Sequence, residues 1–261
     1  MKLLFWQWHS FMGKGVERAL QKLEVGYDTF FYQMKDWEED EIFAEQLESR
    51  LATGQYNIVF SINFNPIISE VCEMHHIAYR AWVYDSPIHI RNLTPLKNTY
   101  TKAYFFDRGQ VLEYRKNGIA AEYLPLAADV ETFSSIAVSE QERKEYQSEI
   151  SLVGQLYQTV YPQYAAPLDA YEKGYLEGIM AAQKLVYGGY FLPDFLTDDL
   201  IRKMNAAYQK AWNGNIAVNK REVEFLLASE ITRRERFEIL SLLSNHFDVA
   251  LYSGDSDAHL N

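Results

Sequence analysis

The sequence predicts an α/β protein that begins with a Rossmann-like parallel sheet flanked by helices. Over the first 128 residues, short apolar runs alternate with segments whose apolar residues recur at helical spacing. The run NIVFSI at 57–62 is almost continuously apolar, as expected of a strand that is buried on both faces of a parallel sheet. Strands separated by helices of about 10 to 15 residues are typical of βαβ units.

Strands and helices are expected to follow one another regularly through this half. Six strands are predicted, at 2–7, 27–32, 57–62, 78–84, 103–106 and 121–124. The first two helices are marked by apolar residues three or four positions apart, which are Val16, Leu20 and Leu23, then Phe43, Leu47 and Leu51. Acidic residues at the start of the second helix fit the helix dipole.

Two further helices have recognisable ends. Asn65 is a good N-cap and Pro66 suits the first helical position, so a helix should begin there. A shorter helix over 109–117 should end at Gly118, because glycine readily adopts the conformation that terminates helices. The inner face of the first of these helices should carry Ile68, Val71, Cys72 and His75.

The pattern changes after residue 128, which suggests two domains. Residues 1–128 would form the first domain, and the polar segment 129–149 a linker in which Ser139–Glu142 fits a capping box. Residues 150–261 read as the start of a second domain that carries a helical insertion over 160–229.

This second domain is expected to contain little sheet. Its predicted elements are a strand at 150–157, helices at 163–187, 197–212 and 219–229, a helix opened by a capping box at 232–235, and a strand at 247–252. Two strands give an independent sheet little stability, so we expect a truncated domain that continues in the natural protein beyond Asn261.

Composition argues against several classes of protein. A net charge of -11 would repel the phosphates of nucleic acid. The single cysteine, Cys72, allows neither an intrachain disulfide nor a cysteine-based metal site. The pattern at Asp255–Asp257 matches a short acidic motif of metal-dependent sugar transferases, but such triplets occur often by chance, so no metal is predicted. Without a signal peptide or a membrane-spanning stretch, we expect a soluble, cytoplasmic protein.

Candidate ligand-binding residues follow the predicted strands, because open parallel sheets bind ligands beyond the carboxyl ends of their strands. Most of these side chains can hydrogen-bond a hydroxyl-rich ligand, and we expect them to converge on one edge. They are Trp8, His9 and Ser10 after the first strand, Asn63 and Phe64 after the third, Asp85 and Ser86 after the fourth, and Asp107 after the fifth. Each also has a purely structural interpretation, as a turn residue or a helix cap.

Several segments in order resemble a known bacterial family. They are LLFWQWHSF, YNIVFSINFNPIISEVC, AYRAWVYDSP, AYFFD, YLPLAAD, ISLVGQLY and KGYLEGIMAAQKLVYG. Together they resemble the uncharacterised domain that precedes group 1 glycosyltransferase domains in the CgeB-like proteins. The resemblance implies a GT-B architecture of two facing Rossmann-like domains, of which this chain would be the N-terminal, acceptor-binding half with an incomplete donor domain.

The resemblance also implies an activity. The intact protein would transfer a sugar from a nucleotide-sugar donor to a hydroxyl acceptor, without a metal or other cofactor. By this analogy Gly154 and Tyr157 would approach the donor diphosphate. Because most of the donor domain is missing, including its acidic ribose-binding segment, the fragment itself is expected to be inactive.

The leading hypothesis assigns roles to the strand-end residues. In an inverting reaction Asp85 would be the general base, with His9 the next choice, whereas a retaining reaction would need no such base. The acceptor would be bound by Trp8, Ser10, Asn63, Phe64, Ser86 and Asp107. The alternative is a non-catalytic glycan- or protein-binding module with the same Rossmann-like fold.

Overall fold

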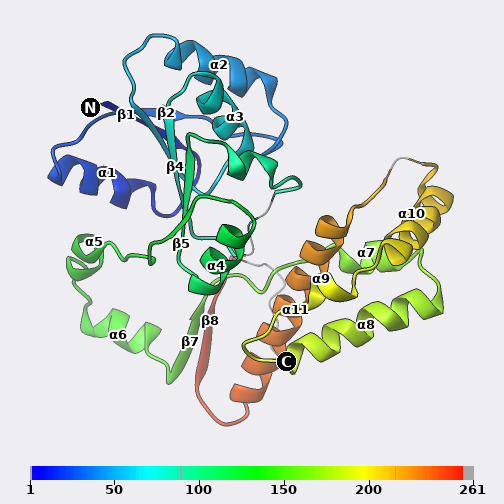
Figure 1. Cartoon of the computed structure of the whole chain (residues 1–261). Helices are drawn as coiled ribbons and strands as arrows, with labels where there is room; N and C mark the ends of the chain where they lie inside the picture. Colours follow the sequence, from blue (N-terminus) through cyan, green and yellow to red (C-terminus); the bar gives the residue numbers. More distant parts are fainter. Residues whose placement is uncertain (1, 87, 89, 215, 255–261) are drawn as a thin grey trace. The chain divides into compact units, whose positions relative to one another are not determined.

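The chain forms two compact units. The computed structural model describes residues 2–86, 88, 90–214 and 216–254. The units comprise Met1–Ile136 and Ala137–Asn261 (Figure 1). The division falls inside the segment 129–149.

The first unit contains a six-stranded parallel sheet, which confirms the predicted α/β class. Its strands are β1 (Lys2–Gln7), β2 (Gly26–Phe31), β3 (Ile58–Ile62), β4 (Ala78–Val83), β5 (Thr101–Phe105) and β6 (Ala121–Tyr123). They lie in the order β2-β1-β3-β4-β5-β6, and every neighbouring pair is parallel. The winding reverses at β1, so the sheet has a topological switch point between β1 and β3, where ligands of such sheets bind.

Helices cover both faces of this sheet, as a Rossmann-like fold requires. They are α1 (Gly13–Lys22), α2 (Glu41–Leu51), α3 (Pro66–Met74), the 3-10 helix η1 (Thr94–Lys97), α4 (Arg108–Lys116) and α5 (Val130–Ser134). Leu4 and Trp6 belong to the core formed with α2 and α3, whereas Leu3 and Phe5 belong to the cluster that contains residues of α1. Figure 1 shows α1 apart from α2 and α3 around this sheet. This distribution follows from right-handed crossovers, because the β1–α1–β2 unit winds away from all the later ones.

Predicted helix ends in this unit match the structure. The Asn65 side chain accepts a hydrogen bond from the Ile68 N–H at 3.0 Å, and Pro66 occupies the first turn of α3. Asp107 caps α4 in the same way, accepting from the Gln110 N–H at 2.7 Å. Neither η1 nor α5 was predicted, because both are too short to show a periodic apolar pattern.

The second unit combines a two-stranded sheet with a helical block. The parallel strands are β7 (Ile150–Val153) and β8 (Val249–Tyr252). The helices are α6 (Glu140–Tyr146), α7 (Tyr161–Ala165), α8 (Ala170–Lys184), α9 (Leu192–Phe195), α10 (Asp198–Trp212) and α11 (Lys220–Leu243). Buried Leu176, Met180, Met204, Tyr208 and Leu227 belong to its own apolar core. The capping box predicted between Ser139 and Glu142 is present at the start of α6.

Two predictions for this unit were wrong. The segment 163–187 is not one helix, because Asp169 forms a capping box with Glu172 and begins α8 as a separate helix. The expected helix start at Thr232 lies in the middle of α11. There the Thr232 hydroxyl donates to the Ala228 carbonyl at 2.9 Å, as hydroxyl residues often do inside helices. The predicted capping box is therefore present at Ser139–Glu142, whereas the same sequence pattern at 232–235 does not begin a helix.

Candidate functional site

The ends of four strands lie along one edge of the first unit's sheet. Strands β1, β3, β4 and β5 are consecutive in the sheet and parallel, so the residues that follow them share its carboxyl edge. Asn63, which follows β3, donates from Nδ2 to Asp85 Oδ2 after β4 at 2.6 Å. The side chains that end two different strands are therefore in direct contact.

A pocket of about 310 Å³ opens at this point. Its apolar walls are Trp8, Trp37, Phe64, Val83 and Ile88, and its polar groups are Asn63 and Asp85. It lies beside the switch point between β1 and β3, and its volume is at the lower end for small-molecule sites. Of the eight residues predicted after the strands, the structure gathers Trp8, Asn63, Phe64 and Asp85 in this one pocket.

Asn63 joins the ends of β3 and β4. Its backbone is left-handed, with φ of 60°, a conformation that asparagine tolerates better than most residues. Its Oδ1 accepts from the Tyr84 N–H at 3.0 Å and from the Asp85 N–H at 3.3 Å. Its own N–H donates to the Trp82 carbonyl at 2.8 Å. Asn63 therefore fixes both the backbone and the carboxylate of Asp85.

A buried chain of hydroxyl groups supports this turn from below. Ser61 Oγ donates to the Asn63 carbonyl at 2.5 Å, so its proton is used and Tyr79 must donate to Ser61 Oγ at 2.6 Å. The Tyr79 oxygen in turn accepts from the Asn65 N–H at 2.9 Å. Burial raises the pKa of Tyr79 far above its usual value, which keeps the hydroxyl protonated for this role.

Two tryptophans form the aromatic wall. The Trp8 indole N–H donates to the Ile62 carbonyl at 2.9 Å, and the Trp37 indole N–H to the Phe64 carbonyl at 3.0 Å. The two rings meet edge to face, with 5.2 Å between their centroids. Because both indole donors are used by the protein, these side chains offer a ligand their ring surfaces.

Sequence reasoning missed Trp37, Val83 and Ile88. Trp37 lies in the loop between β2 and α2, which follows an edge strand and carries no periodic signal. The one sequence signal that could have singled out Trp37 is its position within the acidic run DWEED at 36–40. Val83 and Ile88 are ordinary apolar residues, and nothing local separates pocket walls from core.

His9 and Ser10 lie outside the pocket lining. The His9 ring meets the Phe31 ring edge to face at 5.1 Å, and the His9 N–H donates to Gln33 Oε1 at 3.3 Å. The Ser10 N–H donates to the Trp8 carbonyl at 2.6 Å. His9 is therefore directed toward the end of β2 rather than toward Asp85.

Ser86 and Asp107 each form a hydrogen bond with Gln110 in the first turn of α4. Asp107 caps α4 through the Gln110 N–H, and the Gln110 side-chain amide donates to Ser86 Oγ. Both predicted residues thus contact the first turn of α4 instead of the pocket. Their structural interpretation, as a cap and a turn residue, describes the contacts that they make.

The predicted donor residues of the second unit lie beside an arginine. Arg236 donates from Nη1 to the Gln155 carbonyl at 2.5 Å, and its guanidinium lies 4.5 Å from the centre of the Tyr157 ring. A Cβ added to Gly154 would lie 3.6 Å from Arg236 Nη1. Within the described ranges no carboxylate is paired with Arg236, whereas Arg234 is bound by Glu177. Sequence reasoning missed Arg236, because it lies far along the chain on α11.

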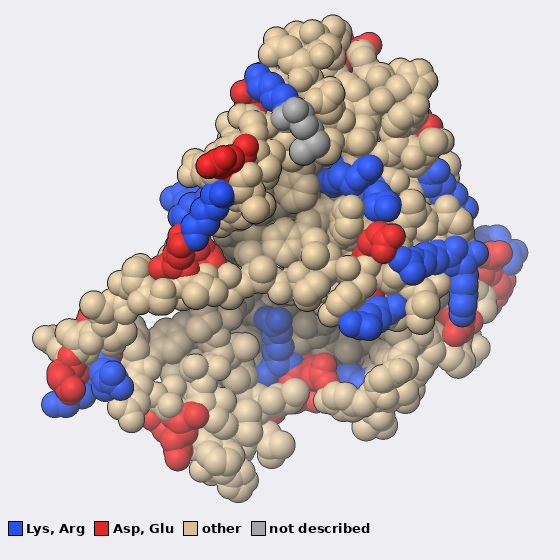
Figure 2. All heavy atoms as spheres, turned by 60° about the vertical axis from the view of Figure 1, so that its left-hand side comes forward, with Lys and Arg blue, Asp and Glu red and all other residues tan. Residues whose placement is uncertain are grey.

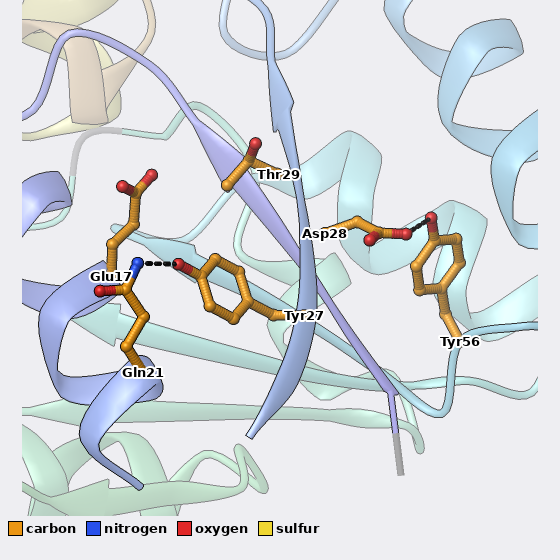
Figure 3. A pocket seen from close by; sticks show the side chains of 6 residues that line it. All are labelled: Glu17, Gln21, Tyr27, Asp28, Thr29 and Tyr56. Atoms are coloured by element: carbon orange, nitrogen blue, oxygen red, sulfur yellow. Dashed lines mark hydrogen bonds between the residues drawn. The ribbon is translucent and has the colours of Figure 1, made fainter. Parts of the chain in front are cut away.

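A larger hollow lies at the open edge of the sheet, along β2. It measures about 800 Å³, and Figure 3 shows Tyr27 and Asp28 on opposite sides of the strand. Tyr27 accepts from Gln21 at 3.0 Å, and Asp28 accepts from Tyr56 at 2.6 Å and pairs with Lys2 at 2.7 Å. Four of its six lining residues are bound in two pairs, Gln21 with Tyr27 and Asp28 with Tyr56, so few of its polar groups are available to a ligand. The smaller pocket is the better candidate site.

Surface charges of both signs are mixed (Figure 2), and the described residues contain no metal-binding cluster. Figure 2 shows basic and acidic side chains lying next to one another over the face that it presents. Among the described residues, no cluster of three or more His, Cys, Asp or Glu side chains is arranged to hold a metal ion. Residues 255–257, with the acidic triplet, lie outside the described part of the chain. No described helix has both the length and the apolar character needed to cross a membrane.

Comparison with known proteins gives no assignment. No family model, no curated protein and no solved structure matches the chain. The resemblance to the CgeB-like family therefore stays a prediction. Any function must be inferred from the pocket and its surroundings.

Proposed function

We propose that this chain belongs to a glycosyltransferase that moves a sugar from a nucleotide-sugar donor to an acceptor hydroxyl, with the acceptor bound in the pocket of the first unit. The observation that carries the proposal is the position of Asp85. Its carboxylate borders a pocket with aromatic walls, and Asn63 holds one of its oxygens at 2.6 Å. An exposed carboxylate with a fixed orientation is suited to general base catalysis.

In this proposal Asp85 accepts the proton of the acceptor hydroxyl. The acceptor oxygen then forms a bond to the anomeric carbon of the donor, and the bond from that carbon to the diphosphate breaks, so that its electron pair leaves with the diphosphate. Trp8 and Trp37 would stack on the acceptor ring, since aromatic rings pack well against the C–H face of a sugar. Asp85 is preferred to His9 as the base, because His9 does not line the pocket.

The second unit would contribute the donor side. A departing diphosphate needs positive charge or hydrogen-bond donors to stabilise it. Arg236, next to Gly154 and Tyr157, supplies a guanidinium without a described carboxylate partner. This contact supports the expectation that the loop after β7 approaches the diphosphate.

The test uses the full-length protein with a panel of nucleotide sugars, followed by thermal shift and by donor hydrolysis or transfer. With an active donor, Asp85→Asn should lower turnover by about 100-fold or more, as loss of a general base does. Asp107→Asn is the matched control, because it also removes a carboxylate from this edge while asparagine remains a good helix cap. Unchanged turnover in Asp85→Asn, or an equal loss in both variants, would remove Asp85 from the proposed role.

A non-catalytic binding module is the second candidate. The observation that favours it is that all the described residues lining the pocket belong to the first unit. Ligand binding there would need nothing from the second unit. Stabilisation of the protein by saccharides, together with no stabilisation and no turnover with any nucleotide sugar, would support this function over transfer.

A further inference from the structure

The charge in the lining of the first unit's pocket is negative. Among its described lining residues, Asp85 is the charged one, and the others are Asn63 and apolar side chains. Asn63 accepts from the Tyr84 and Asp85 N–H groups through Oδ1 and donates one Nδ2 hydrogen to Asp85, which leaves its second Nδ2 hydrogen as the side chain's one further donor. The indole N–H groups of Trp8 and Trp37 are used by backbone carbonyls. The pocket therefore offers a ligand mainly a carboxylate acceptor.

No basic residue is among the described residues that line the pocket, and the arginine beside Trp37 is already paired. Asp36 and Glu38 flank Trp37, and both bind Arg91, at 2.6 Å and 3.4 Å. This guanidinium is therefore already neutralised by two carboxylates. A ligand that brought its own negative charge to Asp85 would meet repulsion without a free cation among these residues to offset it.

The size and surface of the pocket limit what can fill it. A volume of about 310 Å³ suits one ring-sized group rather than a long chain. The ring surfaces of Trp8 and Trp37 are electron-rich, so they favour C–H groups and cations over anions. The aromatic walls and the Asp85 carboxylate therefore both favour a neutral or positively charged ligand over an anion.

We infer that this pocket selects a pyranose-sized ring that presents a hydroxyl or a protonated amine to Asp85, and that it rejects a ring with a carboxylate or phosphate at that position. The inference rests on the proposed function, in that it takes the pocket as the acceptor site, and it adds the charge class of the acceptor. It predicts the order of affinity as amine first, neutral hydroxyl second and acid last.

Binding can be measured without a donor, by quenching of tryptophan fluorescence. The probes are three methyl pyranosides that differ at C6 alone, as a hydroxymethyl, an aminomethyl or a carboxylate group. Trp212→Phe should serve as the background, because Trp212 lies in the second unit. The acid should bind about fivefold more weakly than the neutral sugar, or worse, at low salt, as expected for like charges about 4 Å apart in water.

Two manipulations test the cause of this order. In Asp85→Asn the three dissociation constants should come within about twofold of one another, because the fixed charge is gone while the amide oxygen can still accept a hydrogen bond. In the unmodified pocket the spread should shrink between about 0.01 M and 1 M salt, where the screening length falls from about 30 Å to 3 Å. The salt series needs no substitution in the pocket, so it stands even if Asp85→Asn fails to fold.

Three results would overturn the inference. They are acid binding as tight as that of the neutral sugar, an order of affinity that persists in folded Asp85→Asn, and failure of all three probes to bind. The proposed function fails separately. Binding in the predicted order without turnover of any nucleotide sugar would contradict transfer alone, whereas transfer to an acidic acceptor in this pocket would contradict the charge selection alone.

Discussion

Replacement of Asn63 tests the turn on which the pocket depends. Asn63→Gly removes two side-chain hydrogen bonds to backbone N–H groups, those of Tyr84 at 3.0 Å and Asp85 at 3.3 Å. At about 1 kcal/mol net for each, the free energy of unfolding should fall by about 2 kcal/mol. The third bond, to the exposed Asp85 carboxylate, should contribute little because solvent screens it.

Alanine at the same position should cost more than glycine. Both variants lose the same hydrogen bonds, but a residue with a Cβ is disfavoured by about 1 to 2 kcal/mol in the left-handed region, and Asn63 has φ of 60°. Glycine loses more backbone entropy on folding, which offsets part of this difference. We therefore expect Asn63→Ala to be about 1 kcal/mol less stable than Asn63→Gly and about 3 kcal/mol less stable than the parent.

Urea unfolding followed by tryptophan fluorescence measures these differences. In a Trp212→Phe background the remaining tryptophans, Trp6, Trp8, Trp37 and Trp82, all lie in the first unit, so the signal reports the sheet that contains Asn63. An Asn63→Ala variant as stable as Asn63→Gly, or more stable, would refute the left-handed turn. A cost below about 0.5 kcal/mol in both variants would refute the contribution of the hydrogen bonds.

Two other variants test buried polar groups. Burial opposes ionisation of Glu230, but hydrogen bonds from Arg233 and other neighbours outweigh it and lower its pKa to about 2. A carboxyl group whose pKa is lowered by folding stabilises the folded state at pH values above its unfolded pKa, and this stabilisation is lost as the pH falls to the folded pKa. Between about pH 4.5 and pH 2, the difference in unfolding free energy between the parent and Glu230→Gln, measured by urea unfolding, should therefore shrink by about 3 kcal/mol. A difference that stays constant over this pH range would contradict this reasoning. Tyr79→Phe should cost about 2 kcal/mol, because it leaves the Asn65 N–H without its acceptor and Ser61 Oγ without its donor. An equally stable phenylalanine variant would show that water or relaxation replaces both bonds.

The strands and most helices of the first unit could be predicted from the sequence, because their signals are local. The apolar run at 57–62 and the pair Asn65–Pro66 specify a buried strand and the start of a helix within a few residues of each other. The carboxyl-edge rule then selected Asn63 and Asp85 without knowledge of the strand order. It worked because all parallel strands of one sheet end on the same side.

Prediction from local sequence failed where one short pattern is compatible with two different structures. A hydroxyl residue followed three positions later by an acid begins α6 at Ser139, yet Thr232 in the same pattern lies inside α11. The difference is whether tertiary packing continues the helix past the motif. Asp107 and Ser86 show the same ambiguity, since each could have faced the pocket but instead contacts the start of α4.

The sequence by itself determined the α/β class and which residues follow the strands at the carboxyl edge of the sheet, because backbone hydrogen bonding and burial produce periodic patterns over short spans. The tertiary structure alone decided the strand order β2-β1-β3-β4-β5-β6 and therefore which loops meet. It also brought Trp37 from a loop beyond an edge strand into the lining of the same pocket as Asp85. Contacts between residues far apart in the chain depend on how the elements pack, and many strand orders are compatible with the same local patterns.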